Sequence, residues 1–386
     1  MSRKIRMGMV GGGIGAFIGE VHRKAAAMDG HIDLVCGAFS SDPEKSKKSG
    51  KGLYLPDDRV YGSFEEMCQK EKELPEGERM DFVSIVTPNH VHFPAAKTAL
   101  ENGFHVVCDK PMTVNMKEAK ELASLVEDNG LLFALTHNYT GYPMVKQARE
   151  MIREGDLGEL RKVVVEYPQG WLATKLEEEN KQAAWRTDPE KAGPAGAMGD
   201  IGTHAENLAE YITGLKISEL CADLSSMVKG RVLDDDGNIL LRFENGAKGV
   251  LHASQISAGE ENNLKIFIYG EKGGLEWRQH EPNSLIFRHL DGPAEVYRTG
   301  VDHGYLSDIA LSNTRIPSGH PEGYLEAFAN VYRNVAFTLQ SRLKGEDPKP
   351  EYLDFPDVHD GVRGIAFLET VLASNKSEKK WTTFKS

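Results

Sequence analysis

The first 139 residues alternate short apolar runs with longer stretches of helical spacing, and this alternation constrains the fold more than any other feature of the chain. Each run has four to seven residues and is rich in Val, Ile, Leu and Phe, as expected of strands covered on both faces. The predicted strands are Ile5–Val10, Asp33–Phe39, Phe82–Thr87, His105–Cys108 and Leu131–Thr136. The predicted helices are Phe17–Asp29, Val91–Asn102 and Val114–Asn129. Residues 1–139 are therefore expected to form a doubly wound parallel α/β domain.

The sequence pattern changes after this point, and residues 140–386 are predicted to be a second domain. Alternating apolar and polar positions indicate an open, mostly antiparallel sheet with the strands Arg161–Tyr167, Ile239–Glu244, Lys248–Ile256 and Leu264–Tyr269. The predicted helices are Met144–Glu154, Ile201–Ile212 and Tyr324–Leu343. Glu244 to Ala247 has the composition of a hairpin turn. The acidic run Asp234 to Gly237 lacks the spaced ligands of a calcium loop and is interpreted as a solvated turn.

The composition excludes several classes of partner. A formal net charge of −12 argues against nucleic acid and anionic membrane surfaces, which select for clustered Lys and Arg. The apolar stretch Met7 to Val10 is far too short for a signal segment or a membrane span. Four widely spaced cysteines without a Cys-x-x-Cys pair indicate free thiols in a reducing compartment: Cys36, Cys68, Cys108 and Cys221. We expect a cytoplasmic protein with a small-molecule partner.

A glycine-rich loop follows the first predicted strand and opens the first helix. Gly11, Gly13 and Ala16 form a G-x-G-x-x-A pattern, with Ile14 and Gly15 between the last two. Glycines there permit a tight turn and the close approach of a pyrophosphate, and the helix start supplies free N–H groups for its charge. The loop is predicted to bind a dinucleotide such as NAD(P).

The end of the second strand bears on the choice of nucleotide. An NAD enzyme usually has Asp or Glu there to hold the ribose hydroxyl, but this chain has Ser40 and Ser41, with Asp42 about two positions late. The serines and Lys45 suit a 2′-phosphate, so NADP is slightly favoured over NAD. Alternatively, Ser41 or Asp42 simply caps a helix opened by Pro43.

Three further motifs follow in order: Thr87-Pro88-Asn89-His90-Val91-His92, Asp109-Lys110-Pro111 and Gly199-Asp200-Ile201-Gly202-Thr203-His204. With the glycine loop, they resemble the glucose-fructose oxidoreductase, inositol dehydrogenase and rhizopine catabolism (Gfo/Idh/MocA) family over nearly the whole chain. The resemblance implies a catalytic group that maps to Lys110, Asp200 and His204. Two departures stand out: Asp109 replaces the usual Glu, and His137-Asn138-Tyr139 lacks an arginine often found thereabouts.

The chemistry of these side chains agrees with that mapping. Oxidation of a secondary alcohol needs a base near neutrality, which suits His204. Asp200 lies four residues earlier on the same helical face, where it can bind a neighbouring hydroxyl or hold the imidazole. Lys110 follows a parallel strand and can stabilise alkoxide charge. A metal site is not expected, because these residues lack a further ligand and the chain has no zinc motif. Taken singly, Asp200 would more often be a helix cap and His204 a buried core histidine.

The remaining candidates are less specific. Thr87, Pro88, Asn89 and His92 are expected to border the cofactor or cap the next helix, and Asp109 to support Lys110. Trp185 and Arg186 resemble a cofactor-proximal pair, although an isolated Trp is more often core. His137, Asn138, Tyr139 and Trp171 are candidate substrate contacts. The resemblance implies a homodimer or homotetramer formed through the open sheet.

The expected function is hydride transfer between NAD(P) and a secondary alcohol or ketone of a sugar, glycoside or inositol. The alternatives are a non-catalytic regulator that senses a nucleotide or sugar, a redox-assisted glycosidase, and an imine or tetrapyrrole reductase.

Overall fold

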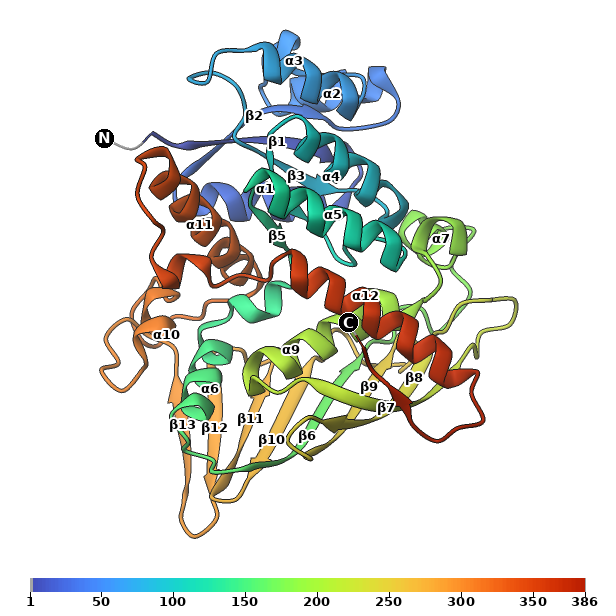
Figure 1. Ribbon diagram of the computed structural model, residues 1–386, viewed down its shortest axis with the longest axis vertical. Helices are drawn as coiled ribbons and strands as arrows, with labels where there is room; N and C mark the ends of the chain where they lie inside the picture. Colours follow the sequence, from blue (N-terminus) through green and yellow to red (C-terminus); the bar gives the residue numbers. More distant parts are fainter. Residues whose placement is uncertain (1–2, 386) are drawn as a thin grey trace. The chain divides into compact units, whose positions relative to one another are not determined.

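The computed structural model describes residues 3–385, and the chain divides into two compact units (Figure 1). Unit 1 comprises the residues up to Asn138 together with Tyr324–Val362. Unit 2 comprises Tyr139–Gly323 and the residues from Arg363 onward. The first break adjoins the boundary expected near residue 139. By its contacts, however, Tyr324–Val362 belongs with the first unit, although the sequence alone assigns it to the second domain.

Unit 1 is built on a five-stranded parallel sheet with the order β2-β1-β3-β4-β5. Its strands are β1 (Ile5–Gly11), β2 (Ile32–Ala38), β3 (Phe82–Val86), β4 (His105–Cys108) and β5 (Phe133–Leu135). All five were expected from the apolar runs. The predicted doubly wound parallel sheet is confirmed.

Helices cover both faces of this sheet: α1 (Phe17–Met28), α2 (Pro43–Gly52), α3 (Phe64–Glu73), α4 (His92–Glu101), α5 (Met116–Asn129) and α11 (Tyr324–Leu343). Met7 and Met9 of β1 share a core with α1 and α11. Gly8, between them, faces Met67 of α3. Successive strand residues point to opposite faces, so helices on both sides account for the continuous apolar runs. Short 3-10 turns complete the unit: η1 (Asp57–Arg59), η2 (Asn89–Val91) and η5 (Pro350–Leu353).

Unit 2 contains a nine-stranded sheet with the order β13-β12-β11-β10-β6-β9-β8-β7-β14. Its strands are β6 (Leu160–Pro168), β7 (Ile217–Ser225), β8 (Asp236–Phe243), β9 (Lys248–Ser254), β10 (Lys265–Gly270), β11 (Gly273–Arg278), β12 (Ser284–His289), β13 (Ala294–Arg298) and β14 (Thr382–Thr383). Every neighbouring pair is antiparallel except β6 and β9, which run parallel at the centre. The predicted mostly antiparallel sheet is confirmed.

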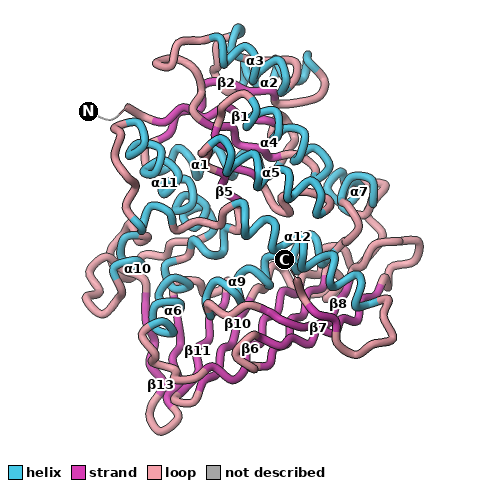
Figure 2. Tube along the Cα trace, in the orientation of Figure 1, coloured by secondary structure: helices cyan, strands magenta, loops and turns pink. Residues whose placement is uncertain are grey.

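One face of this sheet is covered by helices of the same unit, as Figure 2 shows for α6 (Pro143–Arg153) and α9 (Thr203–Thr213). Val163, Val165 and Leu251 point into this core and are fully buried. Their neighbours Val164 and Val250 lie on the opposite face and are half-exposed. The remaining helical segments are η3 (Asn138–Gly141), α7 (Lys181–Arg186), α8 (Pro189–Ala192), η4 (Met198–Gly202), α10 (Asp308–Ser312) and α12 (Val358–Asn375), whose first residues belong to unit 1.

The acidic run before β8 is not a solvated turn, so that prediction was wrong. Asp235 is 2% exposed, and its carboxylate accepts the backbone N–H groups of Met227 and Val228. Asp234 accepts the N–H groups of Gly196 and Met198. A buried carboxylate is tolerated when such donors satisfy it. Composition alone does not reveal these donors, because they are backbone groups of other loops.

Candidate active site

The glycine loop of unit 1 folds tightly against its neighbours. Gly11, Gly12 and Gly15 have positive φ angles, a region that side chains other than glycine rarely adopt. A Cβ on Gly13 would lie 2.7 Å from the carbonyl oxygen of Phe39 and from Ser49 Oγ, so only glycine fits there. The loop thus brings bare backbone to the edge of the sheet, as close binding of a ligand requires.

The start of α1 fits an anion. Ala16 is the N-cap and offers no side-chain hydrogen bond to the first turn of the helix. The N–H of Ile14 is already engaged, since it donates to Ser49 Oγ at 3.1 Å. Arg23 Nη1 of α1 donates to the carbonyl of Gly12 at 2.7 Å and so fixes the loop to the helix. An uncapped helix start beside a glycine turn suits a pyrophosphate.

The segment after β2 forms the start of α2, as the alternative interpretation expected. Asp42 caps this helix by accepting the N–H groups of Glu44 and Lys45. Ser40 Oγ accepts the N–H of Asp42 at 3.2 Å, and Ser41 is exposed. Asp42 therefore acts as the helix cap. The side chain of Lys45, in the first turn of α2, is half-exposed.

The segment after β3 lies against the glycine loop. Thr87 Cγ2 would be 2.7 Å from a Cβ on Gly11, and the buried hydroxyl of Thr87 has no hydrogen-bond partner within the protein. An unsatisfied buried hydroxyl beside the glycine loop suits contact with a ligand, because such groups are costly to leave unpaired. Pro88 follows and leads into η2, which contains Asn89.

His92 has a different position from the one expected. It is 1% exposed, and its ring nitrogens lie 2.8 Å from the carbonyl oxygen of Pro111 and 2.9 Å from that of Thr87. Burial lowers its pKa. Its nitrogens bridge two backbone segments, and His92 therefore positions the loops that carry Thr87 and Lys110.

Asp109, which precedes Lys110, has a side chain that is 16% exposed. Its Oδ1 accepts the Thr136 hydroxyl at 2.6 Å and lies 3.0 Å from His22 Nε2. Burial alone would raise the pKa of Asp109, but the His22 ring and the Thr136 hydroxyl outweigh it and lower the pKa to about 2. The other ring nitrogen of His22 lies 2.7 Å from the Tyr332 hydroxyl of α11. Asp109 thus connects the ends of β4 and β5 with α1, and through His22 also with α11.

His137 lies near Lys110 within unit 1, and Asn138 follows it in the chain. Burial and, to a smaller extent, the charge of Lys110 lower the pKa of His137 to about 3. Asn138 is 2% exposed, and its Nδ2 has no hydrogen-bond partner within the protein. The Lys110–Pro111 peptide bond is cis. Lys110 thus has a neutral imidazole nearby, and the next residue after that histidine carries an unsatisfied amide donor; both groups suit contact with a polar ligand.

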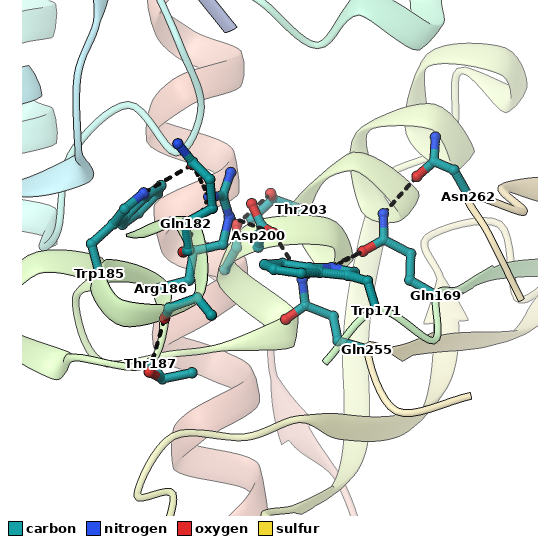
Figure 3. A network of polar contacts seen from close by, with 12 residues as sticks. Gln169, Trp171, Gln182, Trp185, Arg186, Thr187, Asp200, Thr203, Gln255 and Asn262 are labelled. Carbon is teal, nitrogen blue, oxygen red and sulfur yellow. Dashed lines mark hydrogen bonds and ion pairs between the residues drawn. The ribbon is translucent and has the colours of Figure 1, made fainter. Parts of the chain in front are cut away.

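In unit 2, Asp200 lies on a single π-helical turn, η4, which leads directly into α9 and His204. Such π turns are rare and occur often at functional sites. The carboxylate Oδ2 of Asp200 accepts Gln255 Nε2 at 2.8 Å and Arg186 Nε at 3.1 Å. Figure 3 shows Arg186 and Gln255 converging on Asp200 from different segments. These two donors hold the carboxylate in one orientation.

Arg186 is held by aromatic and amide groups. Its guanidinium carbon lies 4.2 Å from the ring centroid of Trp185 and 5.8 Å from that of Trp171. Its Nη1 donates to Gln182 Oε1 at 2.6 Å. Three sequence candidates, Trp171, Trp185 and Arg186, therefore gather around Asp200 within one unit (Figure 3).

His204 is packed against two buried tyrosines. Its ring contacts Tyr139 edge-on, with centroids 4.9 Å apart, and Tyr167 lies on the same side at 6.3 Å. The two hydroxyls bond to one another, and Asn262 Nδ2 donates to Tyr139 at 3.1 Å. Tyr139 is 3% exposed, so it orients His204. This burial disfavours the predicted direct substrate contact by Tyr139.

Several polar residues around Asp200 have no signal in the sequence. Gln255 follows β9, and Gln182 lies on α7. Gln169 accepts Trp171 Nε1 at 3.0 Å and donates to Asn262 at 2.5 Å. Single Gln and Asn residues do not form a recognisable sequence motif, so only the fold shows that these amides lie around Asp200.

Two absences concern the part of the chain that the structure describes. Between residues 3 and 385, no helix has the length and apolar character needed to cross a membrane. Over the same residues, no cluster of His, Cys, Asp and Glu is suited to hold a metal ion. All four cysteines are free, and Cys221 alone among them is half-buried.

Comparison with known proteins places the fold and these motifs in one class. Residues 5–137 match the oxidoreductase family with an NAD-binding Rossmann fold, and residues 145–276 match the Gfo/Idh/MocA C-terminal domain. The chain belongs to the Gfo/Idh/MocA family of oxidoreductases, which confirms the resemblance drawn from its motifs.

Similar proteins cover nearly the whole chain. It is 34% identical to the uncharacterized oxidoreductase YfiI of Bacillus subtilis, over 100% of this chain and 98% of that protein. The structure of an inositol dehydrogenase homolog from Azotobacter vinelandii, complexed with NAD+, superposes with a TM-score of 0.94 at 35% identity and covers 99% of this chain and 98% of its own. A levoglucosan dehydrogenase from Pseudarthrobacter phenanthrenivorans is 27% identical over 82% of this chain and 88% of its own.

Proposed function

We propose that this oxidoreductase transfers hydride between a nicotinamide dinucleotide and a secondary alcohol or ketone of a sugar, glycoside or inositol. The observation that carries the proposal is the arrangement in unit 2, where Arg186 and Gln255 orient Asp200 on a π turn one helical turn before His204. The names of an inositol dehydrogenase homolog and a levoglucosan dehydrogenase among similar proteins support this substrate class.

Each candidate side chain has a distinct role in the proposed reaction. His204 takes the hydroxyl proton at a ring nitrogen as the carbinol hydrogen leaves as hydride. Asp200 accepts a hydrogen bond from a neighbouring hydroxyl of the substrate and so orients the substrate. We propose Lys110 as the third member of the catalytic group, on the likeness of Asp109-Lys110-Pro111 to the family motif, and its ammonium donates to the reacting oxygen. A nicotinamide dinucleotide held by unit 1 would supply the hydride acceptor for oxidation and the hydride donor for reduction.

Residues of unit 1 would hold the dinucleotide. The uncapped start of α1 and the bare backbone at Gly13 fit the pyrophosphate, and the unsatisfied Thr87 hydroxyl supplies a further polar contact. A preference for NADP over NAD stays a prediction that rests on Ser40, Ser41 and Lys45. The exposed carboxylate of Asp42 counts against it, because it would repel a 2′-phosphate.

The first test is a fluorescence titration of the purified protein with NADH and NADPH, followed by absorbance assays over inositols, aldoses and anhydrosugars. Lys110→Ala and His204→Ala should each lower kcat by at least about tenfold while cofactor affinity stays within a few-fold. Tight binding with turnover on one class of polyol supports the proposal. Wild-type turnover in both variants would contradict the catalytic assignment.

The rival functions give different results in the same assays. A redox-assisted glycosidase releases product while the nicotinamide ends each cycle unchanged. A non-catalytic regulator binds nucleotide or sugar without turnover on any substrate. An imine or tetrapyrrole reductase consumes NAD(P)H with those substrates and leaves polyols untouched.

A further inference from the structure

The loop between β7 and β8 supports the turn that carries Asp200. Asp234 in this loop accepts the N–H of Gly196 at Oδ1 and the N–H of Met198 at Oδ2, both at 2.7 Å. Its backbone carbonyl accepts the N–H of Ala197 at 2.8 Å. Three consecutive N–H groups before the π turn are therefore bound by one residue that lies more than thirty positions away in the chain.

This arrangement replaces an ordinary helix cap. Ala197, the N-cap of the π turn, has no side-chain hydrogen bond of its own to give. The first N–H groups of a helix need acceptors, which a neighbouring Ser, Asp or Asn usually supplies. Here the carboxylate of Asp234, from another loop, supplies these acceptors. Its negative charge also suits the positive N-terminal end of the helical segment that η4 and α9 form.

The close approach of the two loops depends on a glycine. A Cβ on Gly196 would lie 2.1 Å from the carbonyl oxygen of Asp234, closer than any real contact. The N–H of Asp200 donates to the carbonyl of Gly196 at 2.9 Å, an α-type bond that ties the π turn to the residue before it. The position of Asp200 is thus linked through one residue to the carboxylate of Asp234.

The same loop also holds the segment that follows Trp171. Arg231 donates to the carbonyls of Leu172 and Thr174 at 2.7 and 2.9 Å, and Asp235 lies 3.4 Å from its Nη1. Neighbouring residues of one loop thereby hold two segments that surround Asp200. Such support from outside the reacting groups keeps catalytic side chains in a productive geometry.

We propose that Asp234 is a positioning residue for catalysis, which acts through the backbone of Gly196 to Met198 on Asp200 and His204. The inference rests on the proposed function. Asp234 is half-buried and binds three backbone N–H groups of the turn, so its contribution lies in the shape of the turn. Its two oxygens both accept, which an amide with one oxygen cannot do.

The test compares Asp234→Asn with Asp236→Asn. Asp236 begins β8, where its carboxylate accepts only an amide hydrogen of Asn238 and lies 3.5 Å from His252, so it is a matched control two positions away. Asp234→Asn should lower kcat at least tenfold, with KM and cofactor affinity within threefold of wild type. Asp236→Asn should leave all three unchanged. Wild-type kcat in Asp234→Asn would overturn the proposal.

Hydrogen exchange of residues 196–204, followed by mass spectrometry, tests the support independently of turnover. Protection should fall in Asp234→Asn and persist in Asp236→Asn. If Asp234→Asn does not fold, Asp234→Glu keeps two acceptor oxygens but places them one methylene farther from the backbone, so protection and kcat should fall in parallel. Loss of one without the other would contradict the inference. A wild-type protein without turnover contradicts the proposed function, and the positioning role then falls with it, whereas the exchange result still decides whether Asp234 holds the turn.

Discussion

Two aspartates of the candidate site have similar exposure and different partners. Asp109 has a side chain 16% exposed and is bonded to His22 and Thr136 of unit 1. Asp200 has a side chain 18% exposed, and Arg186 and Gln255 both donate to its Oδ2. The partners of Asp109 connect elements of the fold, and those of Asp200 orient it on the π turn. The replacement of the family's Glu by Asp109 is therefore compatible with a supporting role beneath Lys110.

Asp109→Asn is expected to destabilise unit 1 in a pH-dependent way. The folded pKa of Asp109 is about 2, below the ordinary value of 3.8, so the carboxylate stabilises the fold above pH 4 and loses this effect as the pH falls toward 2. The shift corresponds to about 2 kcal/mol at pH 7. Urea unfolding of wild type and variant at pH 7 and at pH 3 measures the difference, which should shrink at the lower pH.

Asp33→Asn is the matched control for this comparison. Asp33 is half-exposed and pairs with Lys4 at 2.8 Å on the surface. Exposed pairs contribute about 0 to 1 kcal/mol, so the control should change unfolding little at either pH. Equal stability of wild type and Asp109→Asn at pH 7 would show that the buried pair contributes nothing.

At the scale of elements, the glycine loop and α2 depend on one another. Gly13 lies against the carbonyl of Phe39 and the hydroxyl of Ser49, and Ser49 binds the N–H of Ile14. Gly13→Ala is expected to push the loop from α2 and to weaken NADH binding at least tenfold, measured by fluorescence titration. Gly52→Ala, at the end of α2 with nothing within 4 Å of an added Cβ, should bind as wild type does. Unchanged affinity in Gly13→Ala would remove the loop from the cofactor site.

The elements that the sequence revealed are those with strong apolar periodicity. The helix Tyr324–Leu343 was predicted with its observed bounds, because Phe328, Tyr332, Val335 and Leu339 form one buried stripe. The helix α2 was considered only as an alternative, because its buried residues include Ser46, Ser49 and Gly50 rather than large apolar groups. Small residues pack closely there, but they leave no periodic signal.

Several elements, most of them in unit 2, gave no clear signal. The edge strand β13 is mostly exposed, and a strand without a buried face lacks the alternation that would identify it. The strands β7, β11 and β12 and the helices α3 and α12 were also not predicted. Their apolar residues are interrupted by charged groups such as Glu276, which is buried with Arg278 and Arg288 as partners.

The candidate site was predictable only where residues lie within a motif. Asp200 and His204 stand four positions apart and follow a recognisable pattern. Gln255 and Asp234 act on the same turn from distant segments, so no local pattern connects them with it. The assignment of Asp234 to a solvated turn failed because charge predicts exposure on average, whereas backbone donors from another loop decide the individual case.

At the scale of the whole molecule, the open face of the unit 2 sheet has a pattern of its own. The strand register aligns Phe267 with Val164, Val164 with Val250 and Val250 with Leu240, so an apolar row crosses the centre of the face. Beside it runs a charged row in which Lys265 pairs with Glu166 at 2.7 Å. A face with an apolar centre and both signs of charge is self-complementary in composition, as an isologous contact between two copies requires.

We propose that this face joins copies of the chain into a dimer or tetramer. Burial of the apolar row in a contact of about 800 Å² per partner would suit a stable interface. Phe267→Lys places a charge in the middle of the row and should shift the protein to monomers, as measured by size-exclusion chromatography with light scattering. Leu290→Lys adds the same charge at a surface position that is 72% exposed in the turn between β12 and β13 and should leave the assembly unchanged. A monomeric wild type, or an unaltered assembly in Phe267→Lys with its circular dichroism intact, would exclude this face as the interface.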